Sequence, residues 1–598
     1  MVNFEQKLFP KPQVIHPSNN LFPVPSTLPY QIEHSSFKSL QNQIKKLGFT
    51  EGNSPEQSLL FIRLDDSTHP EGYRLKISSS RIVLSAKKPV GAFRGLQTLS
   101  QIITLQGANP SIPCMEIEDF PVLNRRGFML DVSRCKVPTM QSVYSLIDLL
   151  ASLHINELQL YIEHTFAFTD HRTVWQNASP FTATEIQEID CYCKDRFIEL
   201  VPNLNSFGHF ERWLCHDNYK HMAECPDGFR REDPFIERDH GTTLKPNQAS
   251  LDFIDSLYKE YLPNFSSHQF NVGLDEPWEL GQGWSKDQID KIGKDKVYLN
   301  HLDGIRGLVE SHGKEMQFWA DVLLENPENA KLLPSSASPV IWGYEPDHPF
   351  QEQAQAISDC NLRYCLAPGT GTWRSFTGRW PSAMQNIDSA IINAKEYGAE
   401  GVLLTSWGDC GNHQPWTTLY PPLLYGAAQA WQGQPVSEVD IVNGMNNLLF
   451  NNQSISPSQA LLELGKLDQK ICSNIPNTSL CWSLLFTPLP DKLLGFLTKN
   501  HNAAQLEEGL EHLQSVRDLV SSPKPNNHQA SMVADEILLG IVLSQKALEK
   551  GISMLGDGNW EPLSSSHSLF SSYENIWLSR ARTGGLKESM DILLHSLT

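Results

Sequence analysis

Cysteine is scarce in this sequence, and long hydrophobic runs are missing from it. The 598 residues include 11 cysteines, an odd number and a low density. This does not suggest a disulfide scaffold, and we expect a reduced, cytoplasmic protein. No stretch approaches the roughly 18 consecutive apolar residues of a transmembrane helix. The opening residues, MVNFEQKLFPKPQVIHP, have no apolar run after the first lysine, so we expect no signal peptide.

Basic residues are also in short supply. Lys and Arg number 48 against 68 Asp and Glu, which gives a net charge of −20 with His neutral. Nucleic acids and anionic membrane surfaces would repel such a chain, so we predict neither as a partner. A neutral or cationic substrate is weakly favoured. With 40% hydrophobic and 19% charged residues, the composition is that of a folded protein, not a disordered or fibrous one.

One pattern recurs eight times between Arg125 and Gly433, where a short β-like run precedes a helical segment. Eight parallel strands, each followed by a helix, form a (β/α)8 TIM barrel, and we predict this α/β fold. The rival, a doubly wound sheet, usually has a Gly-rich phosphate turn after its first strand, whereas this chain continues there with RCKVP. The runs span residues 126–133, 157–163, 198–205, 270–276, 316–323, 339–345, 362–368 and 402–409.

Different patterns flank the predicted barrel. Three strand-like runs (58–64, 72–78 and 81–86) precede a helical one, which predicts a small α+β domain behind an extended lead-in. Beyond Gly433 the apolar residues recur with a period near 3.6, which predicts a helical domain. That domain could cover the barrel, bind a partner or form the interface of a homo-oligomer, and the sequence does not choose. The predicted domains are residues 1–120, 121–433 and 434–598.

The predicted strand ends are rich in aromatic and acidic residues. In a (β/α)8 barrel the active site lies at the carboxyl ends of the strands. Tryptophans beside carboxylates suit a pocket that stacks the apolar face of a sugar and binds its hydroxyls. Any one of them could equally belong to the core, but four at the same end favour a pocket. They are Trp319, Trp342, Trp373 and Trp407.

The pair Asp275-Glu276 ends the fourth run. Neighbouring strand residues point to opposite faces, so both acids can face the barrel mouth only if Glu276 has left the ladder. Pro277 favours this, because proline donates no hydrogen bond and biases the preceding residue to an extended conformation. Two such close carboxylates repel each other, which raises the pKa of at least one and provides the acid and base of a hydrolase. Alone, an Asp-Glu pair would be ordinary surface.

Residues 55–433 resemble glycoside hydrolase family 20, the exo-β-N-acetylhexosaminidases. Asn271-Val-Gly-Leu-Asp275-Glu276 is similar to the family's His/Gly-x-Gly-x-Asp-Glu signature, with Asn in the first place. The small N-terminal domain is similar too, whereas the helical tail lies outside the resemblance. Three further segments are similar to parts of the family barrel. The opening strand is resembled by Arg126-Gly-Phe-Met-Leu-Asp131-Val-Ser-Arg134, the Gly-His of strand three by Ser206-Phe-Gly208-His209, and the closing Trp-Gly-acid by Ser406-Trp407-Gly408-Asp409.

The resemblance implies removal of terminal, non-reducing β-linked GlcNAc or GalNAc from an oligosaccharide or glycoconjugate. In this family the 2-acetamido oxygen of the substrate attacks the anomeric carbon and forms an oxazoline, so no enzyme carboxylate is the nucleophile. By position, Glu276 would be the general acid and then the base that activates water. Asp275 would orient the acetamido group and stabilise its developing positive charge. We expect neither a cofactor nor a metal.

The resemblance carries over further residues by position. Arg126 matches an arginine that binds sugar hydroxyls, although simple barrel geometry places the start of strand one at the far end. Arg134 is better placed and is the second choice. His209 matches the pocket histidine of the family, with a structural histidine in a loop as the alternative. Glu163 could serve as the carboxylate that usually partners this histidine.

The seventh strand departs from the family pattern. A Tyr often follows that strand and binds the acetamido carbonyl, but here the segment reads GTGTWRSF, with Trp373 and no Tyr. Tyr344, from the sixth strand, is the candidate substitute, and Asp409 would hold the outer hydroxyls of the sugar. The predicted substrate-binding residues are therefore Arg126, Glu163, His209, Trp319, Trp342, Tyr344, Trp373, Trp407 and Asp409.

Two other classes of function stay open. A retaining glycosidase with an enzymic nucleophile needs a second carboxylate about 5 Å from the acid. Glu163, Asp321, Glu345 and Asp409 all stand at strand ends. A non-catalytic sugar-binding barrel is the second alternative, although binding alone gives no reason to place two self-repelling acids together.

Three other patterns in the sequence do not predict a site. Cys215, His216, His221 and Cys225 are potential zinc ligands, but their spacing is not that of a common structural site. Cys191 and Cys193 lie at i, i+2 on a predicted helix and so do not face each other as a redox pair. The glycines after the seventh strand lack the lysine of a phosphate-binding loop.

Overall fold

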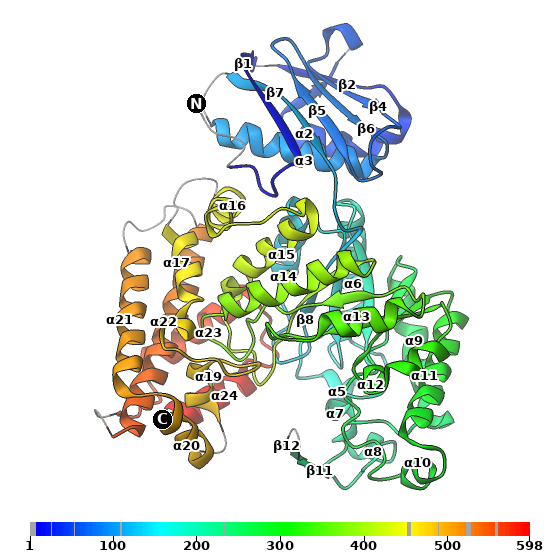
Figure 1. Ribbon diagram of the computed structural model, residues 1–598, viewed down its shortest axis with the longest axis vertical. Helices are drawn as coiled ribbons and strands as arrows, with labels where there is room; N and C mark the ends of the chain where they lie inside the picture. Colours follow the sequence, from blue (N-terminus) through cyan, green and yellow to red (C-terminus); the bar gives the residue numbers. More distant parts are fainter. Residues whose placement is uncertain are drawn as a thin grey trace.

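The computed structural model describes residues 7–25, 27–52, 54–107, 111–232, 235–450, 456–487, 490–521, 528–556 and 560–598. Figure 1 shows a small N-terminal lobe above a larger body, in which a barrel is flanked by C-terminal helices. Within those ranges, no helix combines the length and the apolar character needed to cross a membrane.

The N-terminal lobe is a seven-stranded mixed sheet with helix α3 (Pro89–Gln106) packed against it. In its strand β5, buried Tyr73, Leu75 and Ile77 alternate with exposed Arg74 and Lys76, the period that a half-buried strand requires. The expected lead-in is instead part of the sheet, because β1 pairs antiparallel with β7. In spatial order the strands are β1 (Val14–Pro23), β7 (Ser111–Asp119), β5 (Tyr73–Ile77), β6 (Ile82–Ala86), β4 (Leu60–Leu64), β2 (Leu28–Ile32) and β3 (Phe49–Glu51).

Eight parallel strands close into a barrel, which confirms the predicted (β/α)8 fold. Each strand forms within or at the edge of one of the eight runs, and β17 pairs with β8 to complete the circle. These strands are buried almost throughout, which explains their near-continuous apolar sequences. They are β8 (Arg125–Asp131), β9 (Glu157–Ile162), β10 (Glu199–Leu204), β13 (Gln269–Asn271), β14 (Glu315–Trp319), β15 (Ala337–Trp342), β16 (Cys365–Ala367) and β17 (Gly401–Ser406).

Helices with capped N-termini connect successive strands of the barrel. The Thr139 hydroxyl accepts a hydrogen bond from Ser142 N at the start of α4, and Thr182 forms a capping box with Glu185 at the start of α6. Because each helix begins where a loop of the mouth ends, these caps fix the ends of the mouth loops. The main helices are α4 (Met140–Ser152), α6 (Ala183–Lys194), α9 (Gln248–Tyr261), α11 (Lys294–Ser311), α13 (Phe350–Ser358), α14 (Trp380–Glu396) and α15 (Tyr420–Gln432).

The loops at the mouth contain short elements of their own. The loop after β10 is the most elaborate, with two helical turns and a hairpin that projects from the lower end of the molecule in Figure 1. Its elements are α7 (Glu211–Leu214), α8 (Asp217–Lys220), β11 (Phe229–Glu232) and β12 (Phe235–Arg238). The loops after β9, β13 and β14 carry α5 (Arg172–Trp175), α10 (Lys286–Ile292) and α12 (Asp321–Leu324).

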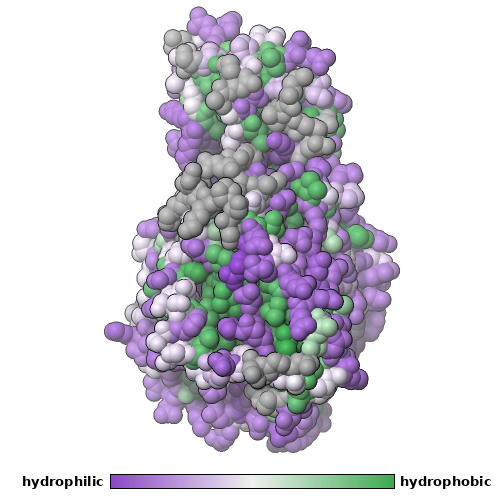
Figure 2. Space-filling view, turned by 90° about the vertical axis from the view of Figure 1, so that its left-hand side faces the viewer, coloured by the Kyte–Doolittle hydropathy of each residue, from purple (hydrophilic) through white to green (hydrophobic). Residues whose placement is uncertain are grey.

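The C-terminal region is helical, as its 3.6 period predicts. Its long helices α21 and α22 pack on each other at the side of the barrel. Figure 2 shows that side of the molecule, where mostly hydrophilic side chains surround a central group of hydrophobic ones. The helices are α16 (Glu438–Phe450), α17 (Ser456–Leu464), α18 (Leu467–Lys470), α19 (Leu480–Phe486), α20 (Pro490–Asn500), α21 (Ala503–Ser521), α22 (His528–Met554), α23 (Ser568–Arg580) and α24 (Leu586–Leu597).

The two flanking regions contact opposite ends of the barrel. Glu71, between β4 and β5, forms an ion pair with Arg126 at the start of β8 (2.6 Å), which ties the N-terminal lobe to the barrel floor. At the mouth, Arg212 of α7 pairs with Glu588 of α24 (2.6 Å). The C-terminal helices therefore cover part of the mouth, the first of the three roles that the sequence left open.

Candidate active site

The pair Asp275-Glu276 lies in a turn that follows a short strand. β13 ends at Asn271, and Gly273, Leu274 and Glu276 have φ angles of 71°, 73° and 45°. The extended conformation expected for Glu276 is therefore wrong: its backbone is left-handed, an unfavourable state for a residue with a side chain. Both acids have left the ladder, and the turn brings them to the same neighbour.

That neighbour is His209, which follows β10. Its Nε2 lies 3.1 Å from Asp275 Oδ2 and 3.4 Å from Glu276 Oε2. Burial alone would lower the pKa of His209, but the two carboxylates outweigh it and hold the pKa well above its usual value. At neutral pH His209 is therefore a cation between two acids. Asp275 is buried, whereas the Glu276 side chain is 34% exposed and can be reached by a ligand.

Arg134 lies on the other side of His209. Its guanidinium is 3.0 Å from both Asp131 and Glu163 and 4.7 Å from the centre of the Tyr161 ring. Glu163 belongs to the cluster, but it lies closer to Arg134 than to His209, whose Nδ1 is 3.9 Å away. Burial raises the pKa of Glu163, with Arg134 opposing the shift. Arg134, the second choice for the sugar-binding arginine, is therefore the one of the two candidates that lies at the mouth.

A third carboxyl group, Asp321, completes the acidic cluster. The backbone N–H of Glu276 donates to Asp321 Oδ2 (3.0 Å), and Trp342 Nε1 donates to Asp321 Oδ1 (3.4 Å). Burial, together with the nearby charge of Asp275, raises the pKa of Asp321 from 3.8 to about 8. Burial therefore favours the protonated form of Asp321, and its hydrogen bond with the Glu276 N–H holds the turn that carries Glu276.

Aromatic side chains line the mouth as a cluster separate from the main core. Trp319, Trp373 and Trp407 are buried, whereas Trp342 and Tyr344 are half-buried and stack on each other with ring centres 5.1 Å apart. Fully buried and partly exposed rings thus both occur within the predicted set. Trp319 Nε1 is buried and has no hydrogen-bond partner among the described residues.

Hydrogen bonds fix two of these rings. Trp407 Nε1 donates to Tyr344 Oη (2.8 Å), which leaves the hydroxyl hydrogen of Tyr344 to donate elsewhere. Trp373 Nε1 donates to Asn477 Oδ1 (2.6 Å). Asn477 lies in the C-terminal region, beyond α18, so that region contributes to the wall of the mouth. Sequence reasoning missed Asn477, because nothing in its segment marks a site.

The last two acids at the strand ends differ in their pairing. Glu345 forms an ion pair with Arg379 (3.0 Å) and accepts a hydrogen bond from Asn477 N (2.6 Å), so it has a structural role. Asp409 is half-buried, and burial raises its pKa, with Arg134 opposing the shift. In the described part of the chain, the Asp409 carboxylate has no hydrogen bond or ion pair, which leaves it available to a ligand.

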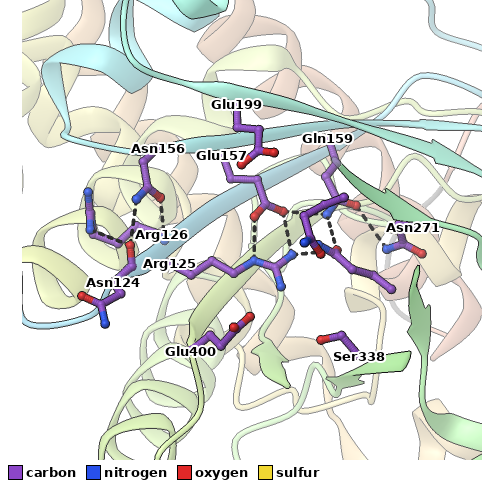
Figure 3. A network of polar contacts seen from close by, with 12 residues as sticks. Asn124, Arg125, Arg126, Asn156, Glu157, Gln159, Glu199, Asn271, Ser338 and Glu400 are labelled. Carbon is purple, nitrogen blue, oxygen red and sulfur yellow. Dashed lines mark hydrogen bonds and ion pairs between the residues drawn. The ribbon is translucent and has the colours of Figure 1, made fainter. Parts of the chain in front are cut away.

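Arg126 lies at the opposite end of the barrel from this cluster. It is fully buried at the start of β8, donates to the carbonyl oxygens of Leu123 (2.7 Å) and His154 (2.9 Å), and pairs with Glu71. Figure 3 shows it beside Asn124 and Asn156. Its assignment to the sugar pocket is therefore corrected: strand one begins with Arg126 at the floor and ends near Arg134 at the mouth.

The four potential zinc ligands, which the sequence disfavours as a site, do not form a metal-binding group among the described residues. Among the described residues, the group close enough to hold a metal ion is His209, Asp275 and Glu276, whose ligand atoms lie within 4.8 Å of one another. Cys215 is exposed and Cys225 is buried, and all the cysteines are free thiols.

Comparison with known proteins identifies the family. The model described as "Glycosyl hydrolase family 20, catalytic domain" matches residues 124–369, and the one described as "Glycosyl hydrolase family 20, domain 2" matches residues 5–120. The chain belongs to glycoside hydrolase family 20. It is therefore a glycoside hydrolase by family, with the acidic turn and His209 inside the matched region.

The similar proteins cover different shares of the chain. Beta-hexosaminidase subunit A1 of Dictyostelium discoideum is 27% identical over 69% of this chain and 80% of its own length. The beta-hexosaminidase of Porphyromonas gingivalis is 25% identical, and the match spans 59% of this chain and 47% of that protein. The Flavobacterium johnsoniae chitobiase structure, at 17% identity and a TM-score of 0.63, covers 99% of this chain and 100% of its own. The fold likeness therefore extends through the C-terminal helices.

Proposed function

We propose that the protein is an exo-β-N-acetylhexosaminidase that removes terminal, non-reducing β-linked GlcNAc or GalNAc by substrate-assisted, retaining hydrolysis. The observation that carries the proposal is the contact of His209 with both Asp275 and Glu276 at the mouth of a family 20 barrel. The beta-hexosaminidase names of the similar proteins support it.

The two acids take different parts in the proposed reaction. Glu276, which is partly exposed, donates a proton to the leaving oxygen and later accepts one from water. The acetamido oxygen of the substrate attacks the anomeric carbon and forms the oxazolinium ion. Asp275 Oδ1 is buried and has no hydrogen-bond partner among the described residues, so it can accept the acetamido N–H and stabilise the positive charge.

The remaining mouth residues form the proposed sugar pocket. The free hydroxyl hydrogen of Tyr344 would donate to the acetamido carbonyl, in place of the missing tyrosine after strand seven. Trp342 offers a half-exposed ring for stacking, and Asp409 an unpaired carboxylate for the outer hydroxyls. Arg134 takes the place that the sequence analysis gave to Arg126. The other proposed lining residues are Glu163, His209, Trp319, Trp373 and Trp407.

The states of Asp321 and Glu345, two of the four candidate nucleophiles, disfavour the rival with an enzymic nucleophile. Asp321 accepts a hydrogen bond from the Glu276 backbone N–H, and burial raises its pKa, which favours the protonated, non-nucleophilic form. Glu345 is engaged with Arg379 and Asn477. A sugar-binding barrel without catalysis gives no reason for a histidine in contact with two acids, one of them partly exposed.

A substrate comparison tests the proposal. The purified protein should hydrolyse nitrophenyl β-N-acetylglucosaminide, β-N-acetylgalactosaminide or both, and ignore the matching β-glucoside, which has a hydroxyl where the attacking carbonyl should be. A stable mimic of the oxazoline should inhibit it strongly. Comparable rates on glucoside and N-acetylglucosaminide would refute substrate assistance, and no turnover of any glycoside would favour the binding barrel.

We also propose that the protein works in the cytoplasm on an N-acetylhexosamine-containing oligosaccharide or glycoconjugate. The eleven free thiols support a reducing compartment. Fractionation of cells that express the tagged chain would test this, and recovery outside the cytoplasm would refute it.

A further inference from the structure

Two buried carboxylates lie close to the proposed catalytic residues but take no part in the proposed reaction. Glu224 and Glu279 have fully buried side chains. Among the described residues, neither forms an ion pair with a lysine, arginine or histidine. A buried carboxylate without a cation is costly unless hydrogen bonds satisfy its oxygens, so the pair needs an explanation.

Glu279, in the loop after β13, is satisfied by the loop after β10. Its Oε1 accepts the backbone N–H groups of Thr242 and Thr243, at 2.6 and 2.7 Å. Its Oε2 accepts the hydroxyl groups of the same two threonines, at 2.8 Å each. One side chain therefore uses four donors from two neighbouring residues of the other loop.

Glu224 makes the same link in the opposite direction. It lies in the loop after β10, and its donors lie in the loop after β13: the N–H groups of Gly281, Gly283 and Ser285, at 3.3, 3.2 and 3.0 Å, and the Ser285 hydroxyl at 2.7 Å. Each loop gives the other one carboxylate and one set of donors. We call this reciprocal link, made by Glu224, Glu279 and their donors, the clamp.

The clamped loops carry the groups that meet at the mouth. His209 directly precedes Phe210, whose N–H donates to the carbonyl oxygen of Thr242 (2.8 Å). Glu276 lies three residues before Glu279. A short chain of contacts thus runs from His209 through Thr242 and Glu279 to Glu276, and it fixes the separation of the two mouth groups.

The turn that carries the acids needs such support. Leu274 and Glu276 are left-handed, and unfavourable backbone conformations persist only where the surroundings hold them. The loops also touch tightly, since a Cβ added to Gly208 would lie 2.3 Å from the carbonyl oxygen of Asp275. The contact of His209 with the acids therefore depends on how the two loops are held.

We infer that Glu279 and Glu224 are positioning residues for the proposed hydrolysis, because the clamp keeps His209 in contact with Asp275 and Glu276. The inference rests on the proposed function. Proton transfer depends on the distance and direction between acid and leaving oxygen, so a loosened clamp slows the step that needs Glu276.

Two substitutions of Glu279 test the clamp. Glu279→Leu removes all four acceptors, whereas Glu279→Gln keeps one oxygen for the two N–H groups, and the threonine hydroxyls can turn to accept from its amide. Glu279→Leu should lower kcat by about 10- to 100-fold on an N-acetylglucosaminide with a sugar leaving group. It should lower kcat less on the nitrophenyl glycoside, leave KM little changed and shift the pH profile of kcat/KM. Glu279→Gln should restore most of the rate.

A control substitution at the barrel floor distinguishes a loss of positioning in the site from a general loss of stability. Glu71→Leu removes a carboxylate at the other end of the barrel, so it should reduce thermal stability without altering the leaving-group dependence or the pH profile. If Glu279→Leu does not fold, the double variant Thr242→Val, Thr243→Val removes only the two hydroxyl donors and should show a smaller shift in the same direction.

The two possible failures are distinct. A folded clamp variant with the leaving-group dependence and pH profile of the wild type would overturn the positioning role. A wild-type protein inactive on every N-acetylhexosaminide would overturn the proposed function itself.

Discussion

Arginines, carboxylates and aromatic rings lie close together at both ends of the barrel. The charged groups, however, are paired differently at the two ends. At the floor, Arg125 binds Glu157 through two hydrogen bonds (2.6 and 2.7 Å; Figure 3). Arg126 binds Glu71. At the mouth, Asp275 and Glu276 share His209, and Asp321 contacts neutral N–H donors. Buried Asp275 Oδ1 and Trp319 Nε1 have no hydrogen-bond partner among the described residues.

This difference distinguishes the floor residues, which stabilise the fold, from the mouth residues, which are placed to react with a ligand. At the floor, Arg125 and Arg126 are paired with Glu157 and Glu71, and the pair with Glu71 ties the N-terminal lobe to the barrel. The mouth keeps acids close together, with raised pKa values at Glu163, Asp321 and Asp409 and a protonated His209. Such perturbed groups in a pocket are the mark of a site that moves protons.

Glu276→Gln should have the largest effect and act only on turnover. We expect a loss of about 10²–10⁴-fold on substrates with poor leaving groups, and a smaller loss in the first step on a nitrophenyl glycoside, which needs little protonation. Steady-state kinetics on both substrates would measure this. Equal losses on the two would contradict the role of Glu276 as the acid.

Arg126→Leu should show the reverse pattern. Removing one partner of a buried ion pair costs about 3–5 kcal/mol of the free energy of unfolding, because the other charge is left unpaired. Chemical denaturation would measure the loss, while kcat of the folded fraction should stay near that of the wild type. A large fall in kcat without loss of stability would return Arg126 to the site.

Asp275→Asn keeps the shape of the side chain and removes its charge. Losing one well-placed electrostatic stabiliser costs about 10²–10³-fold, mainly in kcat, because the charge on the substrate develops in the transition state. The variant should stay folded. Near-normal kcat would remove the central residue assignment and leave the family membership intact.

Asp321→Asn should have the smallest effect, on the pH dependence of stability. The folded state keeps a proton on Asp321 up to a pKa of about 8, whereas the unfolded chain releases it near 3.8. Between these values the folded state binds more protons at Asp321, so the contribution of Asp321 to stability is greatest below 3.8 and falls as pH rises towards 8. Melting temperatures measured from pH 4 to 8 should fall less in the variant. An unchanged slope would contradict the raised pKa.

Repeating patterns in the sequence predict most of the architecture. All eight barrel strands lie where apolar runs alternate with helical segments, because each strand needs both faces buried. The edge strand β1 was missed because it is mostly exposed and has no apolar alternation to mark it.

The site is only partly readable from the sequence. The Asp275-Glu276 motif and His209 stand out locally, but the choice between Arg126 and Arg134 depends on which end of the strand each occupies. The left-handed Glu276 reverses the bias expected from Pro277, because the Asp321 carboxylate and the clamp hold the turn. Asn477 could not be found, because its place in the wall depends on how a distant helical region packs on the barrel.

The most direct test of substrate assistance varies the nucleophile itself. Nitrophenyl β-glucosaminides carrying acetyl, fluoroacetyl, difluoroacetyl and trifluoroacetyl groups differ in the electron density of the carbonyl oxygen and little in shape. If that oxygen attacks the anomeric carbon, kcat/KM should fall steeply with each added fluorine. A flat series would contradict substrate assistance and point to a carboxylate of the enzyme as the nucleophile.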